Sequence, residues 1–427
     1  MRGLMNSTGG QRLTRGASFS VLVSATVVLM ASTSAPSPVY PLYLERWGLS
    51  VTSLTAIFAV YVLGLVGALL TVGSLSDRVG RRPVLIASLV VAAAGTAIFW
   101  AAEGPVWLAL ARVVQGVATG TATGALAAGL LEFAPAERPH RGPTMTAVGT
   151  TFGLAVGGGS AGLLVSLSPR PDGVVFPALT MALLLLAALV SLIPETVARR
   201  KAGFAAMRPR VRVPREARRG FVAAIPAIVA GWSMTGLFLA LAPSLIRDVM
   251  HVRWGAAGGL SITVLFLANS GGGLWAARLT ARRANVIGAV LLSVGAASLG
   301  AALSATSTAV FIGGAIVCGV GAGLTFNGTL RGISEATEAG SRSEVFSAAF
   351  VVSYAALGVP SLAAGLASPL WGLQTTGYVY ITFIGVLSVV AALHAASTIR
   401  RCARAELVLT PLATRPCPQG LDVRQNP

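Results

Sequence analysis

GSLSDRVGRRP, residues 73–83, separates two apolar runs at 51–73 and 83–101, and the fold of the chain can be inferred outward from it. The segment holds one carboxylate, Asp77, among three arginines. A carboxylate in such a place can bind an arginine or the amino terminus of a helix. A run of roughly 20 apolar residues is long enough to cross a bilayer as a helix. The segment is therefore predicted to be a short charged loop between two membrane-spanning helices.

The composition of the whole chain is that of a membrane protein. Of its 427 residues, 54% are hydrophobic and 11% are charged, which is too apolar for an ordinary soluble domain. Because lipid offers no hydrogen bonds to a bare backbone, spanning segments are expected to be helices. We therefore expect an all-α protein whose main surroundings are the lipid bilayer.

Apolar runs between charged or Pro/Gly-rich breaks predict twelve spans. They lie near 17–44, 51–73, 83–101, 105–130, 143–166, 174–194, 219–245, 254–276, 285–303, 307–330, 344–366 and 374–397. The predicted organisation is a tail (1–16), a first six-helix bundle (17–194), a basic central loop (195–218), a second six-helix bundle (219–397) and a second tail (398–427).

The net charge is +18, and the basic residues that produce it lie in alternate loops and in the tails rather than along one face of a helix. The side of the membrane opposite the amino terminus holds Arg46, Arg170, Arg247 and Arg253, whereas the other loops and both tails hold nearly all remaining arginines. A nucleic-acid partner would require a continuous basic stripe, so none is expected. The positive-inside rule predicts that both termini and the central loop are cytoplasmic.

The two halves also resemble each other. GSLSDRVGRR at 73–82 and GLWAARLTAR at 273–282 occupy the same loop of each predicted half. Equal span numbers and this spacing indicate parallel repeats, related by a pseudo-two-fold axis along the membrane normal.

The loop motif resembles the cytoplasmic signature G-x-L-x-D-R-x-G-R-R/K of the major facilitator superfamily (MFS). The matching residues are Gly73, Asp77, Arg78, Gly80, Arg81 and Arg82. The resemblance implies the two-bundle transporter fold. It also implies that these residues form a conformational latch, which ties the two halves together on the cytoplasmic side.

A second resemblance is RVVQG at 112–116, which matches the R-x-x-Q-G motif of the same family. Arg112 lies inside the predicted fourth span, where an unpaired charge is costly. Arg112 and Gln115 share one helical face, with Gly116 beside it. We expect Arg112 to face the central cavity; the alternative is that it snorkels to the nearby outer surface.

GTTFGLAVGG at 149–158 resembles the glycine-rich motif of exporters in the family, with Leu154 in place of its proline. The candidate residues are Gly149, Gly153, Gly157 and Gly158. The resemblance implies efflux. The alternative, close helix packing through a small-residue stripe, explains the same glycines equally well.

No acidic residue lies in the middle of a predicted span, so the group that would couple transport to protons is not evident. Glu45, at the outer end of the first span, is the candidate if it pairs with Arg112; otherwise it is an ordinary interfacial residue. The candidates for a substrate cavity, each of which has a packing role as its alternative, are Tyr40, Trp232, Asn269, Asn327 and Tyr354. A mostly apolar cavity favours a neutral or cationic amphiphile.

The prediction is a monomeric secondary transporter of the cell membrane that moves a small molecule by alternating access, as proton-coupled efflux of a hydrophobic drug or metabolite. An importer or facilitator of a small nutrient is the alternative on the same fold, and an intramembrane enzyme or a sensor is the alternative from another class. No cofactor or metal site is predicted, because His140, His251 and His394 are scattered and no phosphate-binding G-x-x-x-x-G-K-[ST] loop occurs.

Overall fold

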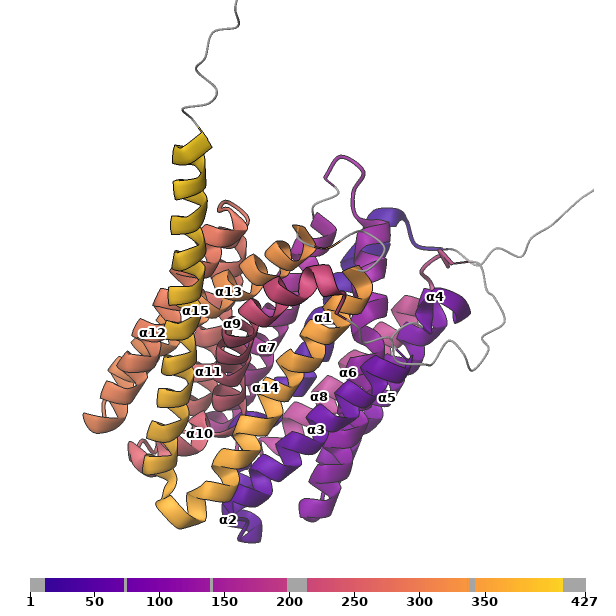
Figure 1. The fold of residues 1–427 in the computed structure, drawn as a ribbon. Helices are drawn as coiled ribbons and strands as arrows, with labels where there is room; N and C mark the ends of the chain where they lie inside the picture. Colours follow the sequence, from indigo (N-terminus) through magenta and orange to yellow (C-terminus); the bar gives the residue numbers. More distant parts are fainter. Residues whose placement is uncertain are drawn as a thin grey trace, which may run out of the picture.

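The computed structural model describes residues 12–72, 75–138, 141–197, 213–335, 337 and 342–409 (Figure 1). These residues form helices joined by short loops, with no strand in the described ranges. Gly73 of the loop motif lies outside the described residues, as do His140 and most of the central loop.

In the described ranges, twelve helical segments are long and apolar enough to span a membrane, which confirms the predicted fold class and span number. The first span is α1 (Arg15–Ser34) continued by α2 (Pro36–Trp47). The others are α3 (Val51–Val72), α5 (Arg81–Trp100), α6 (Pro105–Phe133), α7 (Arg141–Leu167), α8 (Asp172–Ser191), α9 (Arg215–Ala240), α11 (Ala256–Ala276), α12 (Ala281–Ser304), α13 (Thr308–Glu335), α14 (Arg342–Trp371) and α15 (Leu373–Leu409). Three short elements connect them: α4 (Ser76–Val79), α10 (Ala242–Ser244) and the π-helical turn η2 (Leu245–Val249).

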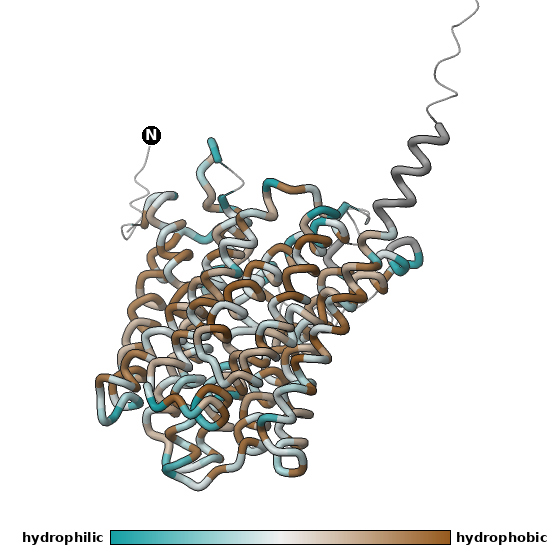
Figure 2. The backbone as a smooth tube through the Cα atoms, turned by 90° about the vertical axis from the view of Figure 1, so that its left-hand side faces the viewer, coloured by the Kyte–Doolittle hydropathy of each residue, from teal (hydrophilic) through white to brown (hydrophobic). Residues whose placement is uncertain are grey.

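Hydrophobic residues predominate along the middle of the bundle, and hydrophilic residues gather at its two ends (Figure 2). Large side chains such as Leu63, Leu167, Met181 and Leu393 are at least 67% exposed. A soluble protein rarely exposes so much apolar area, whereas lipid tails cover it without cost. We call the end that carries α4 the α4 end, and the end that carries α2 and α10 the α10 end (Figure 1).

The first half buries an apolar core of its own, whereas the main core of the second half also includes residues of the first half and so joins the two. The core of the first half includes Leu22, Leu89 and Leu126. The joining cluster combines Phe58 and Tyr61 of α3 with residues of the second half. The halves meet along two helix pairs, α3 with α14 and α7 with α11.

The α7–α11 contact depends on the absence of side chains. A Cβ atom placed on Gly162 would lie 2.6 Å from the Cα of Gly259, so the two backbones touch there. Further along the same helices, the Thr263 hydroxyl donates to the carbonyl of Ala155 at 3.2 Å. In the α3–α14 pair, the Thr52 hydroxyl donates to the carbonyl of Gly365 at 2.6 Å. Close backbone approach supplies dispersion contact that apolar side chains alone cannot give in lipid.

Substitution at the α7–α11 crossing tests this packing. Gly162→Ala is expected to lower the free energy of unfolding by about 1–3 kcal/mol, because the added methyl group overpacks a backbone contact. The matched control is Gly300→Ala, since Gly300 on α12 has open space around its Cα and alanine is the better helix former. Thermal unfolding in detergent measures both variants. Equal midpoints would contradict the proposed contact.

Candidate functional site

Arg112 of α6 is fully buried in the first half, with 0% of its surface exposed. Its Nε donates to the Tyr40 hydroxyl at 2.6 Å. Its Nη1 donates to the carbonyl of Thr33 at 2.8 Å and to Oε1 of Gln115 at 3.2 Å. The guanidinium is therefore held by the junction of α1 and α2 and by its own helix.

The break between α1 and α2 makes these contacts possible. Proline has no backbone N–H, so Pro36 cannot donate to the carbonyl four residues earlier, which belongs to Ser32. The Gln115 side chain supplies the missing donor, with Nε2 at 2.9 Å from that carbonyl oxygen. Pro36 in the first span thus leaves the Ser32 carbonyl free to accept a hydrogen bond from Gln115 of the R-x-x-Q-G motif.

Aromatic rings surround the Arg112 charge in place of a carboxylate. The guanidinium carbon lies 5.3 Å from the ring centre of Tyr40, 5.5 Å from those of Tyr61 and Phe99, and 6.0 Å from that of Phe58. A desolvated cation–π contact contributes about 2 kcal/mol, so several together offset much of the cost of burial. The Nη2 atom is buried and has no hydrogen-bond partner in the described part of the chain.

These contacts correct two expectations for Arg112. The side chain neither opens into a cavity nor snorkels to the surface, because it is buried against the α1–α2 junction. Glu45 is not its partner, since the Glu45 carboxylate is 62% exposed and binds Arg247 instead. Gly116 lets α6 pack directly on the backbone of α3 at Tyr61.

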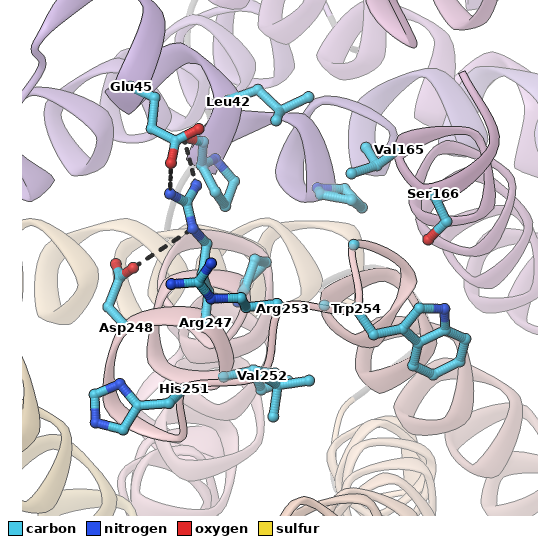
Figure 3. A pocket seen from close by; sticks show the side chains of 16 residues that line it. Leu42, Glu45, Val165, Ser166, Arg247, Asp248, His251, Val252, Arg253 and Trp254 are labelled. Carbon is cyan, nitrogen blue, oxygen red and sulfur yellow. Dashed lines mark hydrogen bonds and ion pairs between the residues drawn. The ribbon is translucent and has the colours of Figure 1, made fainter. Parts of the chain in front are cut away.

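Arg247 of η2 joins the two halves at the α10 end (Figure 3). Its Nη2 forms an ion pair with Oε1 of Glu45 on α2. Its Nη1 donates to the carbonyl of Pro41 at 2.9 Å. Asp248 is a weaker partner, with Oδ1 3.7 Å from Nε of Arg247. Each half thus contributes one member of the Glu45–Arg247 pair.

This pair lies in a cavity of about 1030 Å³ between α2, the end of α7 and the segment that leads from α10 to α11. His251, Arg253 and Trp254 line it from the second half (Figure 3). Partial burial raises the pKa of Asp248 above its usual value, and the Arg247 guanidinium opposes that shift. Sequence reasoning counted Arg247 and Arg253 only as charges of one membrane side, and no local motif indicates that Arg247 meets α2.

The loop motif is organised around Arg81. Its Nη1 binds the Asp77 carboxylate and donates to the Ser76 hydroxyl at 2.7 Å. Its Nε lies 3.3 Å from Oε1 of Glu132 at the end of α6. Arg82 donates to the carbonyl of Ser191 at 3.3 Å, and Arg78 is half-buried in the short helix α4. These contacts all lie within the first half.

Glu195, which sequence reasoning left unassigned, caps helix α5. Its two carboxylate oxygens accept from the backbone N–H groups of Arg81 and Arg82 at 2.8 and 3.1 Å. Gly80 makes room, because a Cβ atom there would lie 2.5 Å from the carboxylate and its φ of +112° disfavours other residues. A negative charge at the amino terminus of a helix is stabilising, because it interacts favourably with the helix dipole. The motif glycine is therefore explained by Glu195, a residue 115 positions later.

The glycine-rich helix α7 presents two faces. Gly149, Gly153 and Gly157 pack against α1, while Gly158 packs against Ile262 of α11 in the second half. The packing alternative therefore accounts for the first three glycines. Gly158 belongs to the contact between the halves.

Two of the five cavity candidates lie together. The ring centre of Trp232 on α9 is 4.9 Å from that of Tyr354 on α14 and 5.6 Å from that of Phe326 on α13. Tyr354 also packs in the cluster that contains Tyr61 of the first half. The remaining three candidates lie elsewhere: Tyr40 binds Arg112, Asn327 donates to the carbonyl of Gly323 in its own helix, and Asn269 is half-buried on α11.

Among the described residues, no group of three His, Cys, Asp or Glu side chains is close enough to hold a metal ion.

Comparison with curated proteins finds a similar segment in an uncharacterized transporter of Schizosaccharomyces pombe. The two are 34% identical over 105 residues, which cover 24% of this chain and 17% of that protein. This local match covers too little of either chain to assign a substrate.

Solved structures share the fold at low sequence identity. A bacterial homolog of the human lysosomal transporter Spinster, in an inward-facing and unoccupied conformation, matches with a TM-score of 0.73 and 13% identity, covering 90% of this chain and 98% of that one. A D-xylose–proton symporter matches at 0.71 and 17%, covering 89% and 97%. The nucleoside transporter NupG matches at 0.70 and 11%, covering 88% and 99%.

The family model described as Major Facilitator Superfamily matches residues 22–361, which is most of the chain and includes both motifs. Together with the twelve spans, this match shows that the chain belongs to the Major Facilitator Superfamily of membrane transporters.

Proposed function

We propose that this protein is a secondary active transporter that moves a small molecule by alternating access, with Glu45 and Arg247 as the gate at the α10 end. The observation that carries the proposal is the ion pair itself, because it links two halves that must separate at that end when the site opens there. The contacts of Thr52 with Gly365 and of Gly162 with Gly259 lie at the same end and support closure.

The orientation follows from the arginines. The loops and tails of the α4 end carry most of them, so we place this end and both termini in the cytoplasm of a cell membrane. The closed gate then faces outward. This placement fits the similarity of the fold to an inward-facing transporter.

The proposed substrate site is the aromatic cluster of Trp232, Phe326 and Tyr354, where the second half meets Tyr61 of the first. Aromatic rings stack on apolar ligands and attract cations through their faces. We therefore propose a neutral or cationic amphiphile as the substrate and the proton as the coupling ion, in a monomer.

Efflux is the direction we propose, supported by the resemblance of residues 149–158 to the glycine-rich motif of exporters. Import of a small nutrient is the second candidate. It is favoured by one observation, the similarity in fold to a D-xylose–proton symporter and a nucleoside transporter.

Glu45 fits a gate better than a proton carrier. A carrier must face each side of the membrane in turn, whereas Glu45 lies at the α10 end and is 62% exposed there. Its ion pair with Arg247 links the two halves at that end instead. Arg247, Asp248, His251 and Arg253 are the other charged or titratable groups that line the same cavity as Glu45.

Transport in proteoliposomes tests the function directly. With purified protein and a panel of sugars, nucleosides and lipophilic cations, we expect saturable flux of an amphiphile that accelerates when protons flow down an imposed pH gradient in the direction opposite to the amphiphile. Flux that ignores the gradient would exclude proton coupling, and gradient-driven uptake of a sugar or nucleoside would establish the importer. Absence of flux for every compound would favour a sensor or an enzyme.

Charge reversal tests the gate. Glu45→Arg should shift the closed-to-open ratio toward open by up to about fivefold, because exposed ion pairs contribute roughly 1 kcal/mol or less. The double variant Glu45→Arg/Arg247→Glu should restore it. Spin labels at Ser50 and His251, in a background without native cysteines, report the separation of the halves.

The matched control for the gate is Arg46→Glu, which breaks the nearby Arg46–Asp172 pair inside the first half. It should leave the label distances unchanged. A distance shift in the control as large as that in Glu45→Arg, or a double variant that fails to recover, would overturn the gate.

Arg112→Lys tests the buried guanidinium. Lysine keeps the charge but cannot bind Tyr40, Thr33 and Gln115 from one planar group, so transport should fall about tenfold or more while gel filtration still shows folded protein. Arg170→Lys, at an exposed loop arginine, is the control. If Arg112→Lys transports as fast as the wild type, the planar guanidinium of Arg112 is not needed for transport.

A further inference from the structure

One face of α9 is charged in its first turn and apolar afterwards. Arg215, Arg218 and Arg219 are followed on the same face by Val222, Ala223 and Pro226, at helical spacings of three and four residues. These six residues line a groove of about 580 Å³, together with His394 of α15. Helices α9 and α15 pack directly at Ala227 and Ala391, so the groove opens beside that contact toward the start of α9.

The groove lies where the spans end. The apolar span of α9 begins at Arg218, and that of α15 ends at Ser397, three residues after His394. The arginines are therefore level with the polar boundary of the membrane, while Val222, which is 54% exposed, lies one turn deeper. From Arg215 to Pro226 the stripe runs about 16 Å at 1.5 Å per residue.

None of the ion pairs between described side chains includes Arg215, Arg218 or Arg219. Helix α9 adds to the positive charge of these arginines, because Pro214 at its N-cap provides no side-chain hydrogen bond to the first backbone N–H groups. A helix amino terminus next to arginines attracts a phosphate group.

We propose that this groove binds an anionic phospholipid, with the phosphate between Arg215, Arg218 and Arg219 and an acyl chain along Val222, Ala223 and Pro226. The order of the two parts along α9 matches the order of headgroup and chain in a lipid leaflet. A soluble anion would use the arginines but leave the exposed apolar turn uncovered. A basic groove between helices at the cytoplasmic boundary is well suited to acidic headgroups.

Native mass spectrometry of the detergent-released full-length protein tests this proposal. The probes are phosphatidylglycerol, phosphatidylcholine with the same acyl chains, and glycerol 3-phosphate. We expect phosphatidylglycerol to be retained in preference to phosphatidylcholine. The variant Arg215→Gln/Arg218→Gln/Arg219→Gln should weaken its retention by about tenfold or more.

Two further variants separate the groove from general surface charge and from misfolding. Arg138→Gln/Arg278→Gln/Arg283→Gln removes three exposed arginines from the same end and should retain the lipid as the wild type does. Ala223→Trp keeps every charge but fills the apolar part of the groove, and should reduce retention.

Three results would overturn the proposal: equal loss in both arginine variants, full retention in Ala223→Trp, or displacement of the lipid by an equal concentration of glycerol 3-phosphate. If the groove arginine variant does not fold, Ala223→Trp decides the question.

Discussion

A guanidinium buried with no carboxylate partner among the described residues is the constraint on which the first half of this protein depends. Because the Arg112 cation has no contact with solvent, its surroundings must supply hydrogen-bond acceptors and π faces instead. The helix break at Pro36 leaves a carbonyl for the R-x-x-Q-G motif, and four aromatic rings face the charge. These contacts tie α6 to α1, α2, α3 and α5, so we expect the first half to move as a rigid unit.

A different kind of contact joins the halves. Within the first half, the charged groups are tied by several partners each, as Arg81 and Glu195 illustrate. Between the halves, the described contacts are the apolar cluster around Phe58 and Tyr61, close backbone approaches, a few hydrogen bonds and one exposed ion pair at the α10 end. The polar contacts among them are individually weak and reversible. They can therefore break at the α10 end while the core of the first half stays packed, as the proposed alternating access requires.

The residues of the loop motif are held by side chains that lie far away in the sequence. Gly80 has a backbone conformation that favours glycine, and the space beside it is filled by the carboxylate of Glu195 from the end of the sixth span. That carboxylate satisfies the first N–H groups of α5, while Glu132 from the fourth span completes the shell around Arg81. In the second half, the hydroxyl of Thr280 caps α12 in the corresponding loop. The corresponding helices of the two halves, α5 and α12, are thus capped by different residues, Glu195 and Thr280.

The sequence alone determined the number, order and approximate ends of the twelve spans, because each depends on a local run of apolar residues, and it identified the family through two short motifs. It also placed Trp232 and Tyr354 together as candidates, although for reasons of helix position alone. Only the tertiary structure decided that Glu45 meets Arg247 rather than Arg112, that Glu195 caps α5, and that Arg112 is sealed among aromatic rings. Hydropathy is a property of neighbouring residues, whereas a charge partner is fixed by how distant helices pack, and no local pattern records that.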